Sequence, residues 1–286
     1  MKTLYISDLD GTLLTSGGVL SATSITLLNH AISRGAIFSV ATARTPATVS
    51  KLLAPLHLKV PLVVMTGASL WDSVSGKYSD IQHFTPEQVK AIVKAYTAPK
   101  DGGGFLYTLP SEGEGEGKMV IYHIGEFNEV ERGFMMERID SPFKKFMVSD
   151  TGASQVPARV EDAILFFGMR GNEVADEILK GLRRVKGINP MYYHDWYGPD
   201  ITEIEAFPAG ATKALAVKRL KRLVGAERLV VFGDNYNDLS MMKEADWSVA
   251  VANAVPAVKE AADEVIGSND ADAVPRYILE DFTVTG

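Results

Sequence analysis

The sequence contains no cysteine. Disulfide bonds and thiolate chemistry are therefore excluded, and a reducing compartment such as the cytoplasm is the expected location. The sequence also lacks a surplus of positive charge, because 29 basic and 36 acidic side chains give a net charge of −7. General binders of nucleic acid or of anionic membranes usually carry a basic surplus or patch, so we expect neither partner.

Long hydrophobic runs are missing as well. No apolar stretch approaches the length of a membrane span. The amino-terminal segment "MKTLYISDLDG" is not expected to be a signal peptide, because acidic residues interrupt its apolar run. We therefore expect a cytoplasmic protein, either a monomer or a small homo-oligomer, whose anionic ligands would have to be held by a local site.

The length and the order of elements predict two domains. A chain of 286 residues exceeds what one core usually needs. Strands and helices alternate up to "LVVMTGA", the pattern then becomes mixed, and the alternation returns with the strand "ITEIEAF". This predicts an α/β core with a parallel sheet, formed by residues 1–82 and 198–286 and interrupted by an inserted α/β domain at 83–197.

Hydrophobic periodicity places the helices. Their expected ranges are 21–33, 46–56, 86–96, 172–185, 212–224, 238–245 and 255–262. The segment "EVI" is expected to form the final strand.

Polar residues follow several apolar strands of the predicted core at the point where each strand ends. They are Asp8 and Asp10 after "LYIS", Thr42 and Arg44 after "IFSVA", and Asp234, Asn235, Asn237 and Asp238 after "LVVFG", with Lys213 at a helix start. Ligands of open parallel sheets bind outside the carboxyl ends of the strands. We therefore expect these groups to converge on one crevice.

The chemistry of these groups is that of a metal-assisted phosphate site. Asp8, Asp10 and Asp234 are hard oxygen donors suited to Mg²⁺, and a cation would relieve the crowding of the first two carboxylates. A phosphoryl group would be held by a hydroxyl, an ammonium and backbone N–H groups, supplied by Thr42, Lys213, Gly11 and Thr12.

Four motifs carry a resemblance to a known family. "DLDGT", "ATAR", "GATK" and "FGDNYNDLSMM" resemble, in order and spacing, the motifs of the haloacid dehalogenase superfamily of phosphatases. The long insertion after "VVMTGA" resembles a C2-type α/β cap, and "VANAVPAVKEAADEV" is similar to the closing motif of the Cof-like (subclass IIB) sugar phosphatases. The resemblance implies a Rossmann-like parallel-sheet core with an inserted cap, and a Mg²⁺-dependent phosphomonoester hydrolase acting on small phosphorylated metabolites such as sugar phosphates.

The resemblance also implies roles for individual residues. Asp8 would be the nucleophile that forms an aspartyl phosphate, and Asp10 would protonate the leaving oxygen and then activate water, with Thr42 and Lys213 as further catalytic groups. The implied metal ligands are Asp8, Asp10 and Asp234. The implied phosphate- or substrate-binding residues are Gly11, Thr12, Ala43, Arg44, Asn237, Asp238 and Asn253.

The motifs depart from the family pattern at three places. Ala43 replaces the glycine of "ATGR", Asn235 replaces the second glycine of "GDGxND", and "VANA" replaces "MGNA". Asparagine adopts left-handed backbone angles more readily than most residues, so Asn235 is compatible with a loop that requires them.

Several residues have a second interpretation. Arg44 would either meet the substrate or form a salt bridge or a solvated helix start. Asp238 would either bind metal through water or orient Lys213. Asn237 and Asn253 would either belong to the site or cap a helix.

The inserted domain is expected to close over the leaving group and to determine which phosphomonoester is hydrolysed. His194, Asp195 and Tyr197 are the candidate substrate contacts in it. Two rival functions stay open at this point: a phosphomutase of the same fold, and a non-catalytic sensor of phosphorylated metabolites.

Overall fold

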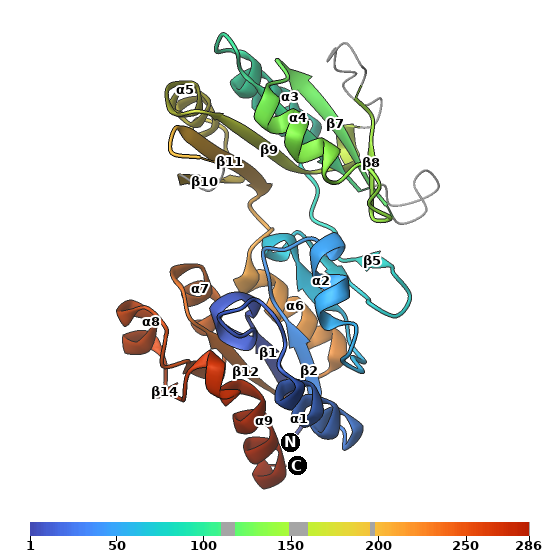
Figure 1. The fold of residues 1–286 in the computed structure, drawn as a ribbon, viewed down its shortest axis with the longest axis vertical. Helices are drawn as coiled ribbons and strands as arrows, with labels where there is room; N and C mark the ends of the chain where they lie inside the picture. The colour runs from blue at the N-terminus through green and yellow to red at the C-terminus, as the bar shows by residue number, and fades with distance from the viewer. Residues whose placement is uncertain (110–117, 149–159, 195–197, 286) are drawn as a thin grey trace. The chain divides into compact units, whose positions relative to one another are not determined.

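The chain forms two compact units in a computed structural model, which describes residues 1–109, 118–148, 160–194 and 198–285. Unit 1 comprises Met1–Asp80 and Gly210–Gly286, and unit 2 comprises Ile81–Ala209 (Figure 1). Unit 2 is thus an insertion in the sequence of unit 1, with junctions after Asp80 and Ala209 where we had expected them after positions 82 and 197.

A five-stranded parallel sheet forms the centre of unit 1. The strand order is β14-β13-β12-β1-β2, and the strands are β14 (Glu264–Val265), β13 (Trp247–Ala250), β12 (Arg228–Gly233), β1 (Thr3–Ser7) and β2 (Ile37–Val40). All five residues of β1 are buried, as expected for a strand in a sheet that is covered on both faces. The predicted parallel α/β core is confirmed.

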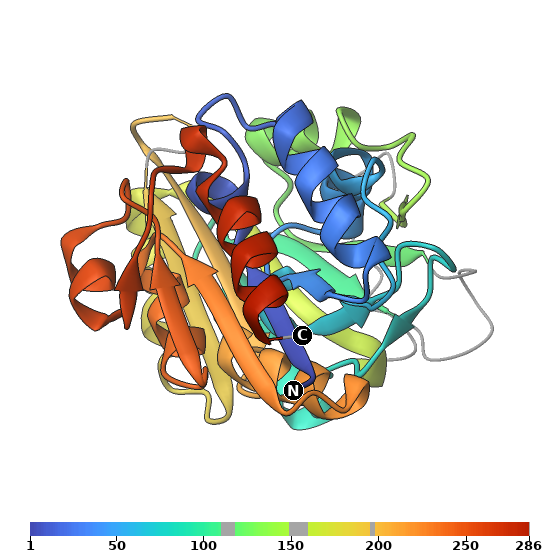
Figure 2. The same cartoon turned by 90° about the horizontal axis from the view of Figure 1, so that it is seen from below.

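The helices of unit 1 follow the expected alternation. They are α1 (Ala22–Ser33), α2 (Pro46–Leu53), α6 (Lys213–Val224), α7 (Leu239–Met242), α8 (Pro256–Ala261) and α9 (Ala273–Thr285). The start of α1 is fixed by Ser21, whose hydroxyl accepts a hydrogen bond from Ser24 N at 2.9 Å. Figure 2 shows α1 and α9 side by side across one face of the sheet.

A small antiparallel sheet completes unit 1. It consists of β3 (Leu62–Val64), β4 (Ser69–Trp71) and β5 (Tyr78–Ser79). Ala41 and Val63 form a parallel bridge that joins β3 to the end of β2. The predicted third core strand therefore continues the parallel arrangement only briefly before the chain turns back into β4.

Unit 2 is a six-stranded mixed sheet with the order β10-β11-β9-β6-β7-β8. Its strands are β6 (Gly103–Thr108), β7 (Met119–Gly125), β8 (Lys144–Phe146), β9 (Ala163–Gly171), β10 (Ile188–His194) and β11 (Ile201–Pro208), and its helices are α3 (Pro86–Thr97), α4 (Glu129–Met136) and α5 (Asn172–Leu182). Helices α3 and α5 pack together on the sheet, and Tyr96, Phe166 and Ile178 are fully buried between these elements.

One part of the sequence-based prediction is corrected, and one helix was not predicted. The strand "ITEIEAF" does not open the returning core, because β11 pairs antiparallel with β9 and β10 in unit 2. Its apolar alternation predicts a strand but carries no information on which sheet receives it. "EVI" does contain the last strand, β14, and the prediction omitted only the helix α9, which follows it and packs against α1.

In the part of the chain that the structure describes, no helix combines the length and the hydropathy required to cross a membrane.

Candidate active site

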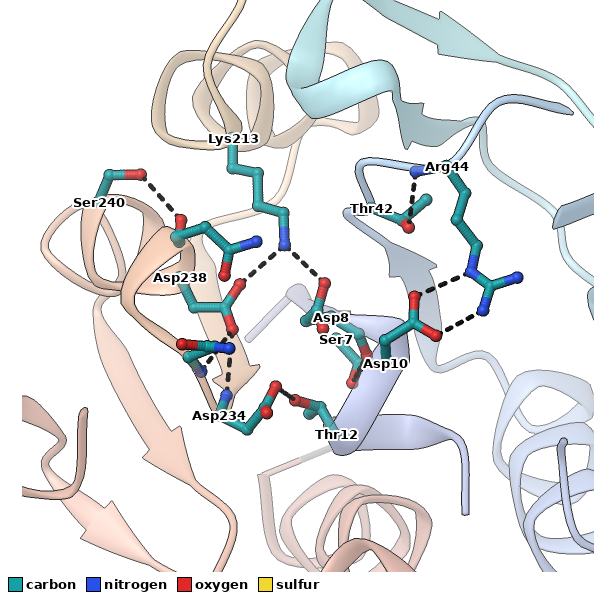
Figure 3. A network of polar contacts seen from close by, with 12 residues as sticks. Ser7, Asp8, Asp10, Thr12, Thr42, Arg44, Lys213, Asp234, Asp238 and Ser240 are labelled. Carbon is teal, nitrogen blue, oxygen red and sulfur yellow. Dashed lines mark hydrogen bonds and ion pairs between the residues drawn. The ribbon is translucent and has the colours of Figure 1, made fainter. Parts of the chain in front are cut away.

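The site is built around Asp8, the residue that follows β1. This strand lies between β12 and β2, so three strand ends meet around it. Asp8 N donates a hydrogen bond to Phe232 O of β12 at 3.0 Å, which continues the strand pairing to the residue that carries the carboxylate. Figure 3 shows the Lys213 side chain directed toward the carboxylates of Asp8 and Asp238, while the Asp234 side chain, from the same loop as Asp238, is directed toward Thr12. The expected convergence of these strand ends is present.

Lys213 is the first residue of α6 and is 2% exposed. A positive charge is disfavoured both by burial and by the positive end of the helix dipole. Two carboxylates compensate it, because Lys213 Nζ lies 2.5 Å from Asp8 Oδ1 and 2.8 Å from Asp238 Oδ1. The sequence left open whether Asp238 binds metal or orients Lys213, and the structure shows the second contact directly.

The protonation of this cluster follows from burial and from its charges. Burial, opposed by Lys213 and reinforced by Asp238, raises the pKa of Asp8 from 3.8 to about 7. Burial disfavours the charged form of Lys213, but Asp8 and Asp238 outweigh that effect and raise the lysine pKa. The ammonium is therefore charged at all physiological pH values, whereas the Asp8 carboxyl takes up a proton near neutrality.

Asp238 also organises the loop after β12. Its Oδ2 accepts hydrogen bonds from Asp234 N at 3.0 Å and Asn235 N at 3.1 Å. Asn235 in turn caps the helical turn Tyr236–Asp238 with its side chain, in a reciprocal capping box. Asn235 has a φ of −129°, so the loop needs no left-handed angle at this position. The spacing of Asn235 and Asp238 was the signal from which the sequence could have predicted this cap.

Three carboxylates could hold a metal ion. Oxygens of Asp8, Asp234 and Asp238 all lie within 4.8 Å of one another. This donor set fits a hard divalent cation that binds a few carboxylates and keeps several waters. Thr12 Oγ1 donates to Asp234 Oδ1 at 2.7 Å and so fixes one ligand. A Cβ at Gly11, whose φ is +77°, would collide with Asp234 Oδ2, which explains the glycine beside it.

Asp10 is not one of the three clustered carboxylates, and its side chain pairs with Arg44 instead. Arg44 binds its carboxylate with two hydrogen bonds, 2.8 Å from Nε to Oδ2 and 2.5 Å from Nη2 to Oδ1 (Figure 3). The Asp10 side chain is 55% exposed and that of Arg44 is 32% exposed, so solvent screens the pair. Hydrogen bonding to Asp10 raises the pKa of Arg44. Of the interpretations of Arg44, the salt bridge is present, while a substrate contact of Arg44 and the expected role of Asp10 as a metal ligand stay predictions.

The loop after β2 presents Thr42. This residue is 1% exposed, and its Oγ1 accepts a hydrogen bond from Arg44 N at 3.1 Å. Among the described residues no contact takes the hydroxyl hydrogen, so the Thr42 hydroxyl is available as a donor, and its contact with a phosphoryl oxygen stays a prediction. Ala43 is exposed between the two residues, and a phosphate contact by its backbone stays a prediction.

The two predicted asparagines differ in their contacts. Asn253 donates from Nδ2 to Gly11 O at 2.7 Å and accepts at Oδ1 from Asn269 N at 3.0 Å. It thus ties the Gly11 loop to the first residue of the short helical turn Asn269–Ala271 and does not cap the following helix α8. Asn237 is exposed within the turn that Asn235 caps. A substrate contact by either asparagine stays a prediction.

The candidate substrate contacts of the inserted domain are largely outside the described residues. Asp195 and Tyr197 lie there, and His194 is the last residue of β10. His194 Nδ1 is 2.9 Å from Thr202 Oγ1, a partner within unit 2. A role for these three residues in substrate binding stays a prediction.

A comparison with protein families gives one match that spans most of the chain. The family described as haloacid dehalogenase-like hydrolase matches residues 5–278 of this chain. This range includes both sequence segments that contribute to the site.

Individual proteins agree with this match. The chain is 26% identical to a 5-amino-6-(5-phospho-D-ribitylamino)uracil phosphatase of Bacillus subtilis, over 96% of this chain and 94% of the relative. It is 25% identical to a pyridoxal phosphate phosphatase of Escherichia coli, over 95% of each chain. Among solved structures, a subclass IIB sugar phosphatase superposes with a TM-score of 0.68 at 21% identity, covering 99% of this chain and all (100%) of the other. The last similarity shows the fold, and the predicted core with an inserted cap is confirmed.

Proposed function

Because the chain belongs to the haloacid dehalogenase-like hydrolase family and is a phosphatase, we propose that it hydrolyses small phosphorylated metabolites, such as sugar phosphates, through an aspartyl phosphate on Asp8. One observation carries this proposal above the others. The buried carboxylate of Asp8, directly after the central strand β1, is paired with the buried Lys213. The carboxylates of Asp234 and Asp238 lie next to this pair.

The nucleophile is already oriented. Lys213 binds Asp8 Oδ1, and no contact among the described residues occupies Oδ2. Oδ2 attacks phosphorus, the bond from Oδ2 to phosphorus forms, and the ester bond from phosphorus to the leaving oxygen breaks. Lys213 and the Thr42 hydroxyl bind phosphoryl oxygens and stabilise the charge that develops on them.

Asp10 handles the protons in this proposal. It donates a proton to the leaving oxygen in the first step, and in the second it takes a proton from the water that attacks phosphorus. The bond from Asp8 to phosphorus then breaks, which releases inorganic phosphate and regenerates the carboxylate. Because Arg44 binds both oxygens of Asp10 in the structure, Asp10 must leave at least one of these contacts when a leaving group is present.

Mg²⁺ is the proposed cofactor. Asp8, Asp234 and Asp238 supply the carboxylate oxygens that would hold it. When bound, it would neutralise charge on the nucleophile and on the phosphoryl group. The contact from Thr12 to Asp234 holds one of these ligands in place.

The substrate class rests on the relatives. They are phosphatases of a phosphorylated ribitylaminouracil and of pyridoxal phosphate, both small phosphomonoesters. We therefore expect activity on compact phosphorylated metabolites and little on phosphoproteins.

A screen for phosphate release tests the proposal. The panel contains hexose and pentose phosphates, pyridoxal phosphate, p-nitrophenyl phosphate and a phosphopeptide, each with and without Mg²⁺. We expect Mg²⁺-dependent release from at least one small metabolite. Isomerised sugar phosphate without free phosphate would identify a phosphomutase, and binding of metabolites without any turnover would identify a sensor; either result contradicts the proposal.

A further inference from the structure

The turn between β3 and β4 has an unusual backbone. Met65, Thr66 and Gly67 have φ values of 51°, 56° and 96°, so three successive residues adopt left-handed angles. For residues other than glycine this conformation costs about 1–2 kcal/mol each, and a β-branched residue such as threonine is a genuine outlier there. Glycine or asparagine would form the same turn at a lower cost.

Two of the three residues are explained by their surroundings. Met65 is 1% exposed, so its side chain contributes to the core of unit 1. A Cβ at Gly67 would collide with Thr212 O and lie 3.1 Å from Ala216 Cβ, so this position must lack a side chain. Packing thus accounts for the methionine and the glycine.

Thr66 has no such explanation. Its side chain is partly exposed, and within the described residues its hydroxyl makes no hydrogen bond. It neither fills the core nor stabilises the turn. Strain that packing does not explain is concentrated at functional positions in proteins.

The backbone of Thr66 contacts the loop that carries Thr42. Thr66 N donates to Thr42 O at 3.0 Å, and Met65 N donates to Arg44 O at 3.0 Å. The strained turn is therefore bonded to the loop that carries the Thr42 hydroxyl. On its other side, Arg219 Nη2 of α6 donates to Gly67 O at 3.1 Å, so the turn also contacts the helix that begins with Lys213.

We propose that Thr66 is a further phosphate-binding residue, whose hydroxyl donates a hydrogen bond to an oxygen of the phosphoryl group beside Thr42. The left-handed turn keeps the residue at this position, and threonine is retained there despite its backbone cost because its hydroxyl binds substrate. The inference rests on the proposed function, since it concerns the same site.

Binding of inorganic phosphate, measured by calorimetry with Mg²⁺ present, tests the inference without requiring turnover. Thr66→Val keeps the shape and the backbone strain but removes the hydroxyl, and we expect it to weaken phosphate binding about tenfold. Thr66→Ser keeps the hydroxyl, and its affinity should stay within about twofold of the wild type. Both variants should retain the wild-type Tm within about 2 °C.

Thr66→Gly separates the strain from the hydroxyl. It relieves the backbone, so the Tm should rise by about 2–4 °C, while phosphate binding weakens as in Thr66→Val. Wild-type phosphate affinity in both Thr66→Val and Thr66→Gly would overturn the inference. If the wild type binds phosphate but hydrolyses no phosphomonoester, the proposed function fails. The phosphate affinities of the Thr66 variants would still decide whether Thr66 binds phosphate.

Discussion

Lys213 Nζ lies 2.5 Å from Asp8 Oδ1, and the lysine is 2% exposed. The proposed nucleophile thus has a permanent counter-ion that solvent does not screen. The same ammonium contacts Asp238 at 2.8 Å, so it separates two buried carboxylates.

Replacing Lys213 tests this arrangement. In Lys213→Met the two carboxylates lose their shared cation, and breaking a buried pair typically costs about 3–5 kcal/mol. We expect that loss of unfolding free energy at pH 8 and a smaller loss at pH 5, where Asp8 holds a proton because its pKa is about 7. Urea unfolding at both pH values measures the difference. The double variant Lys213→Met/Asp238→Asn should recover part of the stability at pH 8, and an equal loss at both pH values would contradict the electrostatic explanation.

The raised pKa of Asp8 also predicts how metal binding depends on pH. The folded protein holds a proton on Asp8 up to about pH 7, whereas an unfolded chain releases it near 3.8. Without metal, this group therefore contributes stability at low pH that is lost as the pH rises through 7. A metal ion must displace the proton, so Mg²⁺ should bind about tenfold more weakly at pH 6 than at pH 8.

Thermal unfolding with and without Mg²⁺ measures this dependence. The Mg²⁺-induced rise in Tm should be larger at pH 8 than at pH 6, and Asp8→Asn should abolish the difference. A larger rise at pH 6 would mean that Asp8 does not exchange a proton for the metal.

Asp10 is predicted to act on the leaving group. Asp10→Asn should lower kcat about 10²- to 10⁴-fold with sugar phosphates, whose alkoxide needs a proton. The loss should be much smaller with p-nitrophenyl phosphate, whose leaving group needs none. The Asp10→Asn variant should keep its fold, because the ion pair with Arg44 is exposed and contributes at most about 1 kcal/mol to the free energy of unfolding. An equal loss of kcat for both substrates would count against the proton-transfer role.

Gly11 and Gly18 form a matched pair for testing the metal ligands. Both have positive φ, +77° and +73°, but a Cβ at Gly11 would collide with Asp234 Oδ2, whereas one at Gly18 meets nothing within 4 Å. Gly11→Ala should therefore displace Asp234 and weaken Mg²⁺ binding. Gly18→Ala should lower the Tm through backbone strain alone and leave Mg²⁺ affinity unchanged. Similar Mg²⁺ affinities in the two variants would remove Asp234 from the metal site.

The sequence predicted which residues converge at the centre of the site, because a polar residue directly after an apolar strand can be recognised from neighbouring residues alone. Asp8, Thr42 and Asp234 each follow an apolar strand, and parallel strands bring such residues to one edge of the sheet. Which side chains then pair was not predictable, because the partner depends on tertiary distance. Thus a salt bridge of Arg44 was one of three interpretations, but Asp10 was not predicted as its partner.

The strand β11 shows what the sequence could not predict about the fold, namely which sheet a strand joins. Its residues 201–206 alternate between partly exposed and buried, a pattern that identifies a strand in any sheet with one covered face. Its hairpin with β10 joins neighbouring strands, but its pairing with β9 spans the helix α5 and left no mark in the local pattern. The strained turn at Thr66 was equally invisible, because left-handed angles are expected at glycine or asparagine and not at threonine.

A covalent intermediate on Asp8 can be observed by rapid acid quench during turnover, followed by mass spectrometry of the peptide that contains this residue. We expect a phosphoryl group on Asp8 in the wild type, and neither the phosphoryl group nor phosphate release in Asp8→Asn, which keeps the size of the side chain. Phosphate release by Asp8→Asn at a rate comparable to the wild type, or a phosphoryl group on a different residue, would contradict Asp8 as the nucleophile.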